Sequence, residues 1–215
     1  MLLTPKADVH ATTLGVFLRA GSLEMQDAQR MLDDGETLDP KYVPGTDAAQ
    51  IRVDAGTIDI ETVGDAKITG IETGNGTESA IRVVSTTGRI LDSGDTRLDI
   101  IADTPPAAQL TISAPLGVGA NPLDVRLLNL QANSDAGVVD LAVQGSVNIL
   151  DIAAGDRVWL TAGGDITGNA VTSGPMRGTD PSTPATGVTL ATTGGSVTLA
   201  SVSSTTGVGV AGQGG

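Results

Sequence analysis

Carboxylates are the residues of this chain that occur in pairs suited to chemistry. The pairs closest in sequence are Asp92 with Asp95, Asp99 with Asp103, and Asp151 with Asp156. Two carboxyl groups beside one groove can act as general acid and base on a polysaccharide. Large aromatic rings usually supply much of the contact area in such grooves, but this chain has one Trp, one Tyr and one Phe. The composition therefore favours solvated turn residues over acid–base machinery.

A Gly-Gly pair in the run GDRVWLTAGGDITG, residues 155–168, raises a second possibility, a loop that cradles phosphate. Such a loop is normally followed by a helix whose N-terminus attracts the anion, and it often carries a Lys. Neither follows Gly163 and Gly164. The pair is therefore predicted to be a corner at which the chain turns, with glycine supplying a positive φ.

Metal sites are not indicated by any ligand pattern. The chain has no Cys and a single His, His10, which is predicted to be exposed without a partner. The acidic runs DSGD and DDGE lack the alternating oxygen ligands of a helix–loop–helix calcium site, and no nonapeptide repeat is visible. We therefore predict no catalytic, cofactor-binding or metal-binding residues, and no cofactor. A calcium-stabilised solenoid module remains an alternative.

The charge balance excludes one class of partner. With 25 acidic and 12 basic residues the net charge is −13, which argues against nucleic acid because Lys and Arg dominate binding to phosphates. No window approaches the 18 or so uninterrupted apolar residues of a membrane-spanning segment. The N-terminal stretch lacks a basic region followed by a compact apolar region, so it is a poor signal peptide.

Short apolar-x-apolar bursts are the repeating element that would position any site. They are Val16–Leu18, Ile51–Val53, Ile81–Val83, Leu110–Ile112, Val139–Leu141, Val158–Leu160 and Val188–Leu190. Their starts are separated by 35, 30, 29, 29, 19 and 30 residues, which indicates a stacked repeat architecture. Helical periodicity is confined to GSLEMQDAQRMLDDG, where strand is preferred at 22–25 because VFLRAGSLEM fits the same strand–glycine–strand plan.

Strand–glycine–strand could form either a β-hairpin or a corner of a parallel β-helix. The strands are shorter than those of a Greek-key sandwich, which favours the β-helix. We predict an all-β fold of eight or nine coils spanning residues 1–215, with irregular coil length. The run 168–187 contains three Pro and four Gly and is predicted to be a long corner loop inserted between strands.

Alternation predicts which residues point outward. If the apolar residues of each burst face the core, then the middle residues face solvent. These are Phe17, Arg52, Arg82, Thr111, Asp140, Trp159 and Thr189. Phe17 and Trp159 could be binding hot spots, but a neighbouring loop is the expected cover for both.

Three runs resemble the repeats of large bacterial exoproteins related to filamentous haemagglutinin. They are VSTTGRILDSGD (84–95), LTISAPLGVGANPLDVRLLNLQANSDAGVVDL (110–141) and GDRVWLTAGGDITG (155–168). The resemblance implies a right-handed parallel β-helix, or β-solenoid, exported by two-partner secretion. It also implies a partner in the outer membrane for the full-length protein, and a place in a longer repeat protein secreted to the bacterial cell surface.

Function follows from that resemblance as an expectation. We expect a non-catalytic segment of the shaft or adhesive surface, with a host or bacterial surface receptor, protein or glycan, as partner. The alternatives are a carbohydrate-active β-helix enzyme, which would gather carboxylates on one face beside a groove, and the calcium-stabilised module.

Overall fold

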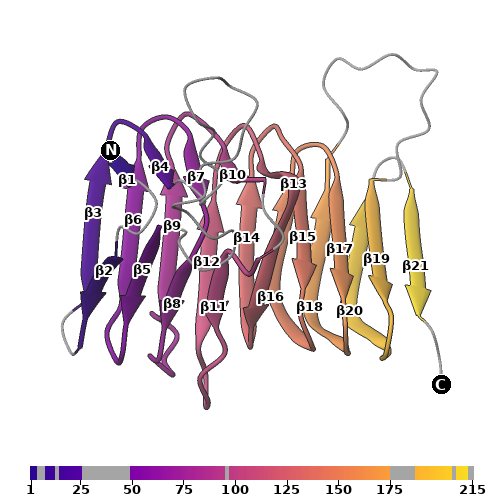
Figure 1. Cartoon of the computed structure of the whole chain (residues 1–215). Coiled ribbons are helices and arrows are strands. Elements are labelled where there is room, and N and C mark those ends of the chain that lie inside the picture. Colours follow the sequence, from indigo (N-terminus) through magenta and orange to yellow (C-terminus); the bar gives the residue numbers. More distant parts are fainter. Residues whose placement is uncertain are drawn as a thin grey trace, which may run out of the picture.

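Regular secondary structure in the described residues consists of β-strands only. The computed structural model describes residues 1–3, 8–12, 15–25, 49–94, 97–174, 187–204 and 207–212. Over these ranges it has 21 β-strands and no helix, which confirms the predicted all-β class. Figure 1 shows the strands side by side in chain order, from the indigo N-terminal end to the yellow C-terminal end.

The strands form two sheets. The thirteen-stranded sheet contains β1 (Leu2–Leu3), β2 (Asp8–Ala11), β4 (Leu23–Met25), β5 (Gln50–Val53), β7 (Ala66–Ile68), β8 (Ile71–Thr73), β10 (Ile90–Asp92), β11 (Ile100–Ala102), β13 (Val118–Leu127), β15 (Val139–Val143), β17 (Val158–Ala162), β19 (Val188–Thr192) and β21 (Val208–Gly212). The eight-stranded sheet contains β3 (Val16–Ala20), β6 (Ile58–Thr62), β9 (Ile81–Ser85), β12 (Gln109–Ser113), β14 (Asn129–Ser134), β16 (Val147–Ala154), β18 (Ile166–Ser173) and β20 (Val197–Ser204).

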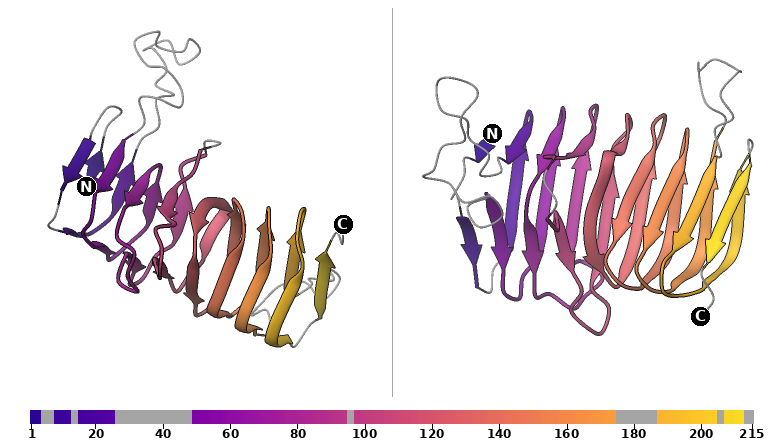
Figure 2. Two further views of the ribbon diagram at one scale, coloured as in Figure 1. Left: turned by 90° about the horizontal axis from the view of Figure 1, so that it is seen from below. Right: turned by 45° about the vertical axis from the view of Figure 1, so that its right-hand side comes forward.

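Every strand pair is parallel, and no strand pairs with the strand that follows it in the chain. The chain crosses from one sheet to the other and returns one layer further on, which Figure 2 shows from below and from the side. We call one such passage a rung. The eight-stranded sheet contributes one strand to each rung, so the described residues form eight rungs. This arrangement is consistent with a parallel β-solenoid.

Columns of aliphatic side chains fill the space between the sheets. In the eight-stranded sheet Ile58, Ile81, Leu110 and Leu130 stack in register, and each is at most 1% exposed. The strands that carry them alternate buried and partly exposed residues, because successive side chains of a strand point to opposite faces. The predicted inward residues of the seven bursts are confirmed as buried, apart from Leu18, which is only partly buried.

The cross-section changes along the stack at β13. In the first rungs the thirteen-stranded sheet has two separate ladders, one through β4, β7 and β10 and one through β5, β8 and β11. Both ladders reach β13: Val118 pairs with Ile90, and Val125 pairs with Ile100. A bulge between Val118 and Leu123 separates the two halves of β13. From β15 onward a single strand replaces each pair of short strands, so a three-sided rung becomes two-sided.

Two predictions about chain organisation need correction. The seven bursts do not occupy one equivalent position, because Val16, Ile81 and Leu110 start strands of the eight-stranded sheet or lie in them, whereas the other four lie in the thirteen-stranded sheet. Both sheets bury the same aliphatic pattern, so the intervals between bursts combine strands from two different sheets.

The predicted loop 168–187 is wrong at its start, since β18 continues to Ser173; residues 175–186 lie outside the described residues. The strand preferred at 22–25 is confirmed as β4.

The predicted corner glycines Gly88, Gly163 and Gly164 act by close approach and not by positive φ, whereas Gly145, at the corner between β15 and β16, does have a positive φ of 100°. Gly163 and Gly164 form the turn between β17 and β18, as predicted, but neither has a positive φ. A Cβ on Gly164 would lie 2.9 Å from the backbone nitrogen of Ser146 in the preceding rung. A Cβ on Gly88 would lie 2.5 Å from the carbonyl carbon of Gly64. Glycine is therefore required where stacked corners touch.

Side-chain oxygens next to these glycines bridge the same corners. Asp65 Oδ1 accepts a hydrogen bond from the backbone N–H of Arg89 one rung on, at 2.9 Å. Ser146 Oγ accepts from the N–H of Asp165 at 3.0 Å, and Asp165 Oδ1 in turn accepts from the N–H of Ser196 at 2.7 Å. Each bond satisfies a corner N–H that the strand ladders do not reach.

Truncating one residue of the core column should destabilise the stack far more than truncating its outward neighbour. We expect Leu110→Ala to lower the free energy of unfolding by about 2–5 kcal/mol, because it leaves a cavity between two rungs. Thr111→Ser, next along β12 and only partly buried, keeps the hydroxyl that accepts from Gln109 Nε2 and should change it by less than about 0.5 kcal/mol. Urea unfolding followed by circular dichroism measures both. Equal effects would contradict the assigned core.

Adding a methyl group should distinguish the stacked corners from the open ones. We expect Gly88→Ala to destabilise by about 1–3 kcal/mol, because its Cβ would overlap the Gly64–Asp65 backbone. Gly21→Ala is the matched control: no atom lies within 4 Å of its added Cβ, and its φ is not positive. That variant should be neutral or stabilising by up to about 1 kcal/mol. Thermal melts of the two variants compare them directly.

Candidate functional site

Charged side chains on the outer face of the first rungs form one connected group. Arg19 on β3 contacts Asp59 on β6 at 3.0 Å and Glu61 at 3.7 Å. Arg82 on β9 contacts the same two carboxylates at 2.7 and 3.4 Å. The parallel register places Arg82 beside Asp59, one rung away, while Arg19 reaches across from the rung on the other side. Two arginines therefore neutralise two carboxylates across three rungs.

Asp59 is the most enclosed of the four, with its side chain 17% exposed. Burial acts to raise the pKa of its carboxyl, but hydrogen bonds from Arg19 and Arg82, and the charges of both, outweigh burial and hold the pKa below its usual value. The pKa of Arg82 is raised, and the largest cause of this shift is the hydrogen bond that Arg82 donates to Asp59. Both carboxylates, Asp59 and Glu61, are paired with arginines, so neither is free to act as a general acid or base.

The thirteen-stranded sheet carries similar pairs on its outer face. Arg52 contacts Glu72 at 3.0 Å, and Arg126 contacts Asp103 at 2.6 Å. His10 was predicted to have no partner, and this prediction is wrong: its Nε2 lies 3.0 Å from Asp54 Oδ1. The two residues are 44 positions apart in the chain, and only the stacking of β2 on β5 brings them together.

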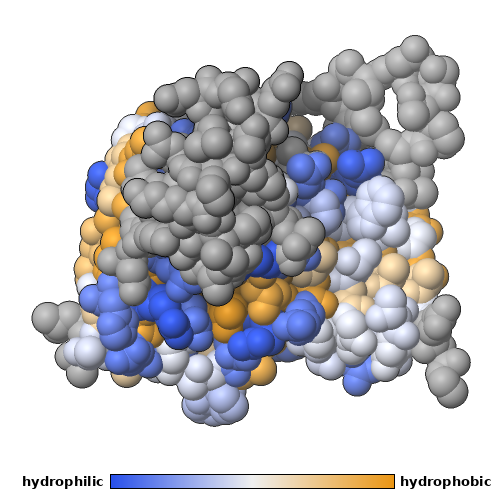
Figure 3. Space-filling view, viewed as in Figure 1, coloured by the Kyte–Doolittle hydropathy of each residue, from blue (hydrophilic) through white to orange (hydrophobic). Residues whose placement is uncertain are grey.

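Ion pairs among the described residues all lie between residues 10 and 126, so charge is concentrated in the N-terminal half. Figure 3, coloured by hydropathy, shows deep-blue hydrophilic residues at the lower left and centre and at the upper right of centre, and paler residues at the lower right, over the C-terminal rungs. There the outward residues are mostly small, such as Ala170, Thr172, Ser201 and Ser203, and these pair in register between β18 and β20.

Trp159 is the aromatic feature of the C-terminal half. It points outward from β17, as predicted, and is 43% exposed; Phe17 on β3 is 67% exposed. Both residues remain exposed, so the expected cover over them is wrong. The guanidinium carbon of Arg157 lies 5.4 Å from the Trp159 ring centroid, within cation–π range. Burial raises the pKa of Asp140, which pairs with Trp159 across the sheet, and the charge of Arg157 opposes this shift.

A hollow of about 350 Å³ lies at the corner next to this group. It is lined by Arg89, Leu91, Leu116, Gly117, Gly119, Ala136, Gly137, Val138, Asp156 and Arg157. Asp156 Oδ1 and Arg157 Nε are buried and have no hydrogen-bond partner among the described residues. Because both atoms are shielded from solvent, a ligand entering the hollow could not reach them. Asp156 supplies the one carboxylate of the lining, so the hollow does not hold the pair of carboxylates that a polysaccharide-cleaving site requires.

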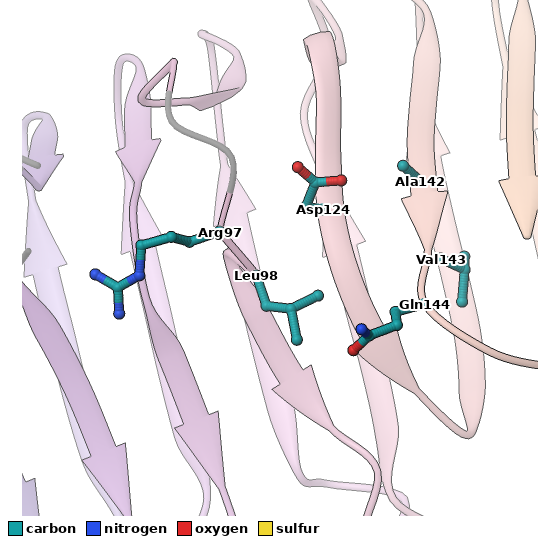
Figure 4. Close-up of a pocket in the computed structure, with 6 residues that line it drawn as sticks. All are labelled: Arg97, Leu98, Asp124, Ala142, Val143 and Gln144. Carbon is teal, nitrogen blue, oxygen red and sulfur yellow. The ribbon is translucent and has the colours of Figure 1, made fainter. Parts of the chain in front are cut away.

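A second hollow, of about 260 Å³, lies where the two ladders of the thirteen-stranded sheet merge. Figure 4 shows its lining, with Arg97 extending away from Gln144. Asp99, which follows the lining residue Leu98 in the chain, is fully buried and accepts a hydrogen bond from the N–H of Asp124 at 2.9 Å. The Asp99 backbone N–H also donates to the carbonyl of Asp124. This carboxylate holds two rungs together.

The carboxylate pairs singled out in the sequence do not gather beside one groove. Asp92 accepts a hydrogen bond from the N–H of Gly94 within its own turn, and Asp95 lies outside the described residues. Asp99 is buried in the stack, whereas Asp103 pairs with Arg126 on the surface. Asp151 is exposed on the outer face of β16, while Asp156 lies at the corner before β17.

Metal ligands do not converge either: within the described ranges no three His, Cys, Asp or Glu side chains come together. None of the described residues forms a helix long and apolar enough to cross a membrane.

Sequence reasoning missed a row of amides on the eight-stranded sheet. Gln109, Asn129 and Asn148 start or nearly start β12, β14 and β16, and Gln131 lies beside them. Gln109 pairs in register with Asn129, and Asn129 with Asn148. The available signal was their spacing of 20 and 19 residues, which equals the local rung length. A search for acidic pairs could not have found it.

Comparison with protein-family models, curated proteins and solved structures finds no match for this chain. Its function must therefore be argued from its own geometry.

Replacing Asp59 should change stability in a pH-dependent way. Because its pKa is lower in the folded state than in the unfolded chain, ionised Asp59 stabilises the fold above its unfolded pKa near 4. That contribution is lost as the pH falls through the lower, folded pKa. We expect Asp59→Asn to cost about 1 kcal/mol at pH 7, and the difference from the unmodified protein to shrink below about pH 4. Urea unfolding from pH 7 to pH 2 tests this.

Asp54→Asn is the control, since the side chain of Asp54 is 61% exposed and its carboxylate pairs with His10. Its effect at pH 7 should be smaller. A penalty for Asp59→Asn that stays constant with pH would contradict the role assigned to its charge.

Proposed function

We propose that the chain is a right-handed parallel β-helix that serves as a structural or adhesive segment of a secreted bacterial surface protein, and that it is not catalytic. The observation that carries this proposal is the uninterrupted parallel stack, in which each rung is bonded to the next through strands and corners alike. A right-handed coil is the hand that parallel strands joined by crossover connections adopt almost without exception.

The three runs that resemble exoprotein repeats support this proposal. Residues 84–95 include the end of β9, a glycine corner and β10, and residues 155–168 include β17, a corner and the start of β18. Residues 110–141 extend from β12 into β15, across the bulge of β13. Each run thus coincides with strand–corner–strand units, which is what a repeat resemblance requires. On this basis we propose two-partner export, with an outer-membrane secretion partner for the whole protein.

The use of the carboxylates favours a structural role over the polysaccharide-cleaving alternative. Asp65, Asp99 and Asp165 accept backbone N–H groups between rungs, and Asp59 is held by two arginines. Acids occupied in this way are fixed by the stack and do not face a common substrate. A shaft or adhesive surface uses the remaining outward side chains to meet a surface receptor, protein or glycan.

A cleavage assay separates the two functions. The purified chain should release no new reducing ends and no unsaturated uronate from pectin, alginate, xylan or chondroitin over a day, while a known lyase does so in parallel. Cleavage that is abolished by Asp156→Asn but retained in Asp151→Asn would overturn the non-catalytic proposal.

Location tests the other half of the proposal. In intact source cells, an antibody against this segment should label the outer surface, and added protease should remove the signal without lysis. Labelling found only after lysis would contradict a surface role.

A further inference from the structure

A polar hollow on the outer face of the eight-stranded sheet has the size of a ligand site. Its volume is about 630 Å³, within the usual range of small-molecule sites. It is lined by Glu78, Ser79, Pro106, Ala107, Gln109, Asn129, Gln131 and Leu150. We refer to it as the amide groove. It lies on β12, β14 and β16, away from the corner that holds Arg157.

Two turns that bond to each other build the wall of the amide groove. The N–H of Ala107 donates to the carbonyl of Gly76 at 3.0 Å, and the N–H of Gln109 donates to the carbonyl of Thr77 at 3.3 Å. These bonds fix the turn carrying Glu78 against the turn before β12. The wall is therefore held in place by the backbone of two rungs, and the groove is formed before any ligand arrives.

The orientation of the central amide is set by its neighbours. Gln109 is 9% exposed, and its Nε2 donates to Thr111 Oγ1 at 3.0 Å and more weakly to Gln131 Oε1 at 3.4 Å. Its Nε2 is thereby committed, which leaves Oε1 to accept. Gln131, exposed beside it, uses Oε1 as an acceptor, which leaves its Nε2 to donate. One acceptor and one donor are thus presented side by side.

Asn129 on the other side is ordered in the same way. Its Nδ2 donates to the carbonyl of Ala108 at 3.3 Å, and its Oδ1 accepts from Asn148 Nδ2 at 2.8 Å. Leu150 is the extra residue of the β16 bulge, since Leu130 pairs with Ile149 and Gln131 with Asp151. This half-buried leucine and Pro106 add apolar surface among the amides.

The chemistry of the lining points to a neutral sugar. The lining contains no Lys, Arg or His, and its one charged residue is Glu78, so an anionic ligand would be repelled. A sugar hydroxyl both donates and accepts, and adjacent amide groups can satisfy it in both directions. The C–H faces of a pyranose ring fit the apolar surface of Leu150 and Pro106. Successive strands of the sheet lie about 4.8 Å apart, so side-chain amides on neighbouring strands repeat at this spacing along the groove.

We propose that the amide groove binds a neutral oligosaccharide, with Gln109, Gln131 and Asn129 hydrogen-bonding its hydroxyls. This inference rests on the proposed adhesive function and deepens it by naming the ligand class and the residues. The proposed role of the groove is binding and not cleavage, because Glu78 is the one carboxylate in its lining and a pair is needed for acid–base hydrolysis.

Titration of the full chain with defined sugars tests the inference. The neutral probes are cellohexaose, maltohexaose, mannohexaose and chitohexaose, and the anionic probe is hexagalacturonate. We expect at least one neutral hexasaccharide to shift the side-chain amide NMR signals of Gln109, Asn129 and Gln131. Trp159, the only tryptophan, lies on the other sheet, so its fluorescence should not change.

Two exposed amides on β14 form a matched pair of variants. Gln131→Ala should weaken binding at least tenfold, whereas Asn133→Ala, two residues on and outside the lining, should leave it unchanged. Both side chains are exposed, so both variants should fold, and circular dichroism checks this. The same sugar affinity in Gln131→Ala as in the unmodified chain would overturn the inference.

Other results would also overturn the inference: binding of hexagalacturonate alone, binding that changes Trp159 emission, or no shift with any neutral probe. Failure at this groove leaves the structural proposal standing, because the cleavage and surface-labelling experiments test that proposal separately.

Discussion

Backbone hydrogen bonding between successive rungs is the constraint on which the rest of this structure depends. A parallel strand has unpaired groups on both edges, so each strand is satisfied only when a rung lies on either side of it. Every residue of a rung must therefore match the rise of its neighbours, including residues at the corners. This requirement explains why the column Ile58–Ile81–Leu110–Leu130 continues without interruption, even though a neighbouring strand carries an extra residue, Leu150.

Corners are the difficult part of such a stack, because the chain must bend while staying at the strand spacing. The structure meets this need with glycine where backbones touch, as at Gly88 and Gly164, and with a side-chain oxygen that accepts the next rung's N–H. Asp65 and Asp165 perform the second task at opposite edges of the molecule. Acidity in the sequence is thus partly a property of the turns, because a carboxylate there accepts the N–H of the next rung.

Local pattern was sufficient to predict the class of fold and the direction of individual side chains. The apolar-x-apolar bursts identified strands, and alternation placed Trp159 and Phe17 outward. What it could not supply was the pairing of one rung with another, because both sheets bury the same aliphatic pattern. Contacts that depend on pairing were therefore missed, such as His10 with Asp54 across 44 residues. The amide groove was missed for the same reason, since its parts come from four rungs.

A solenoid separates stability from recognition more cleanly than most folds. Inward residues and corners determine the stack, while an outward residue such as Gln131 contacts only its neighbours on the same face. Changing outward side chains can therefore alter binding without altering the fold, provided that the register is kept. The outward amides must still be held in a fixed orientation. Here the buried Gln109 orients Gln131, because Gln109 Nε2 donates a hydrogen bond to Gln131 Oε1. A face built this way can recognise a repeating polymer because its own groups repeat at the strand spacing.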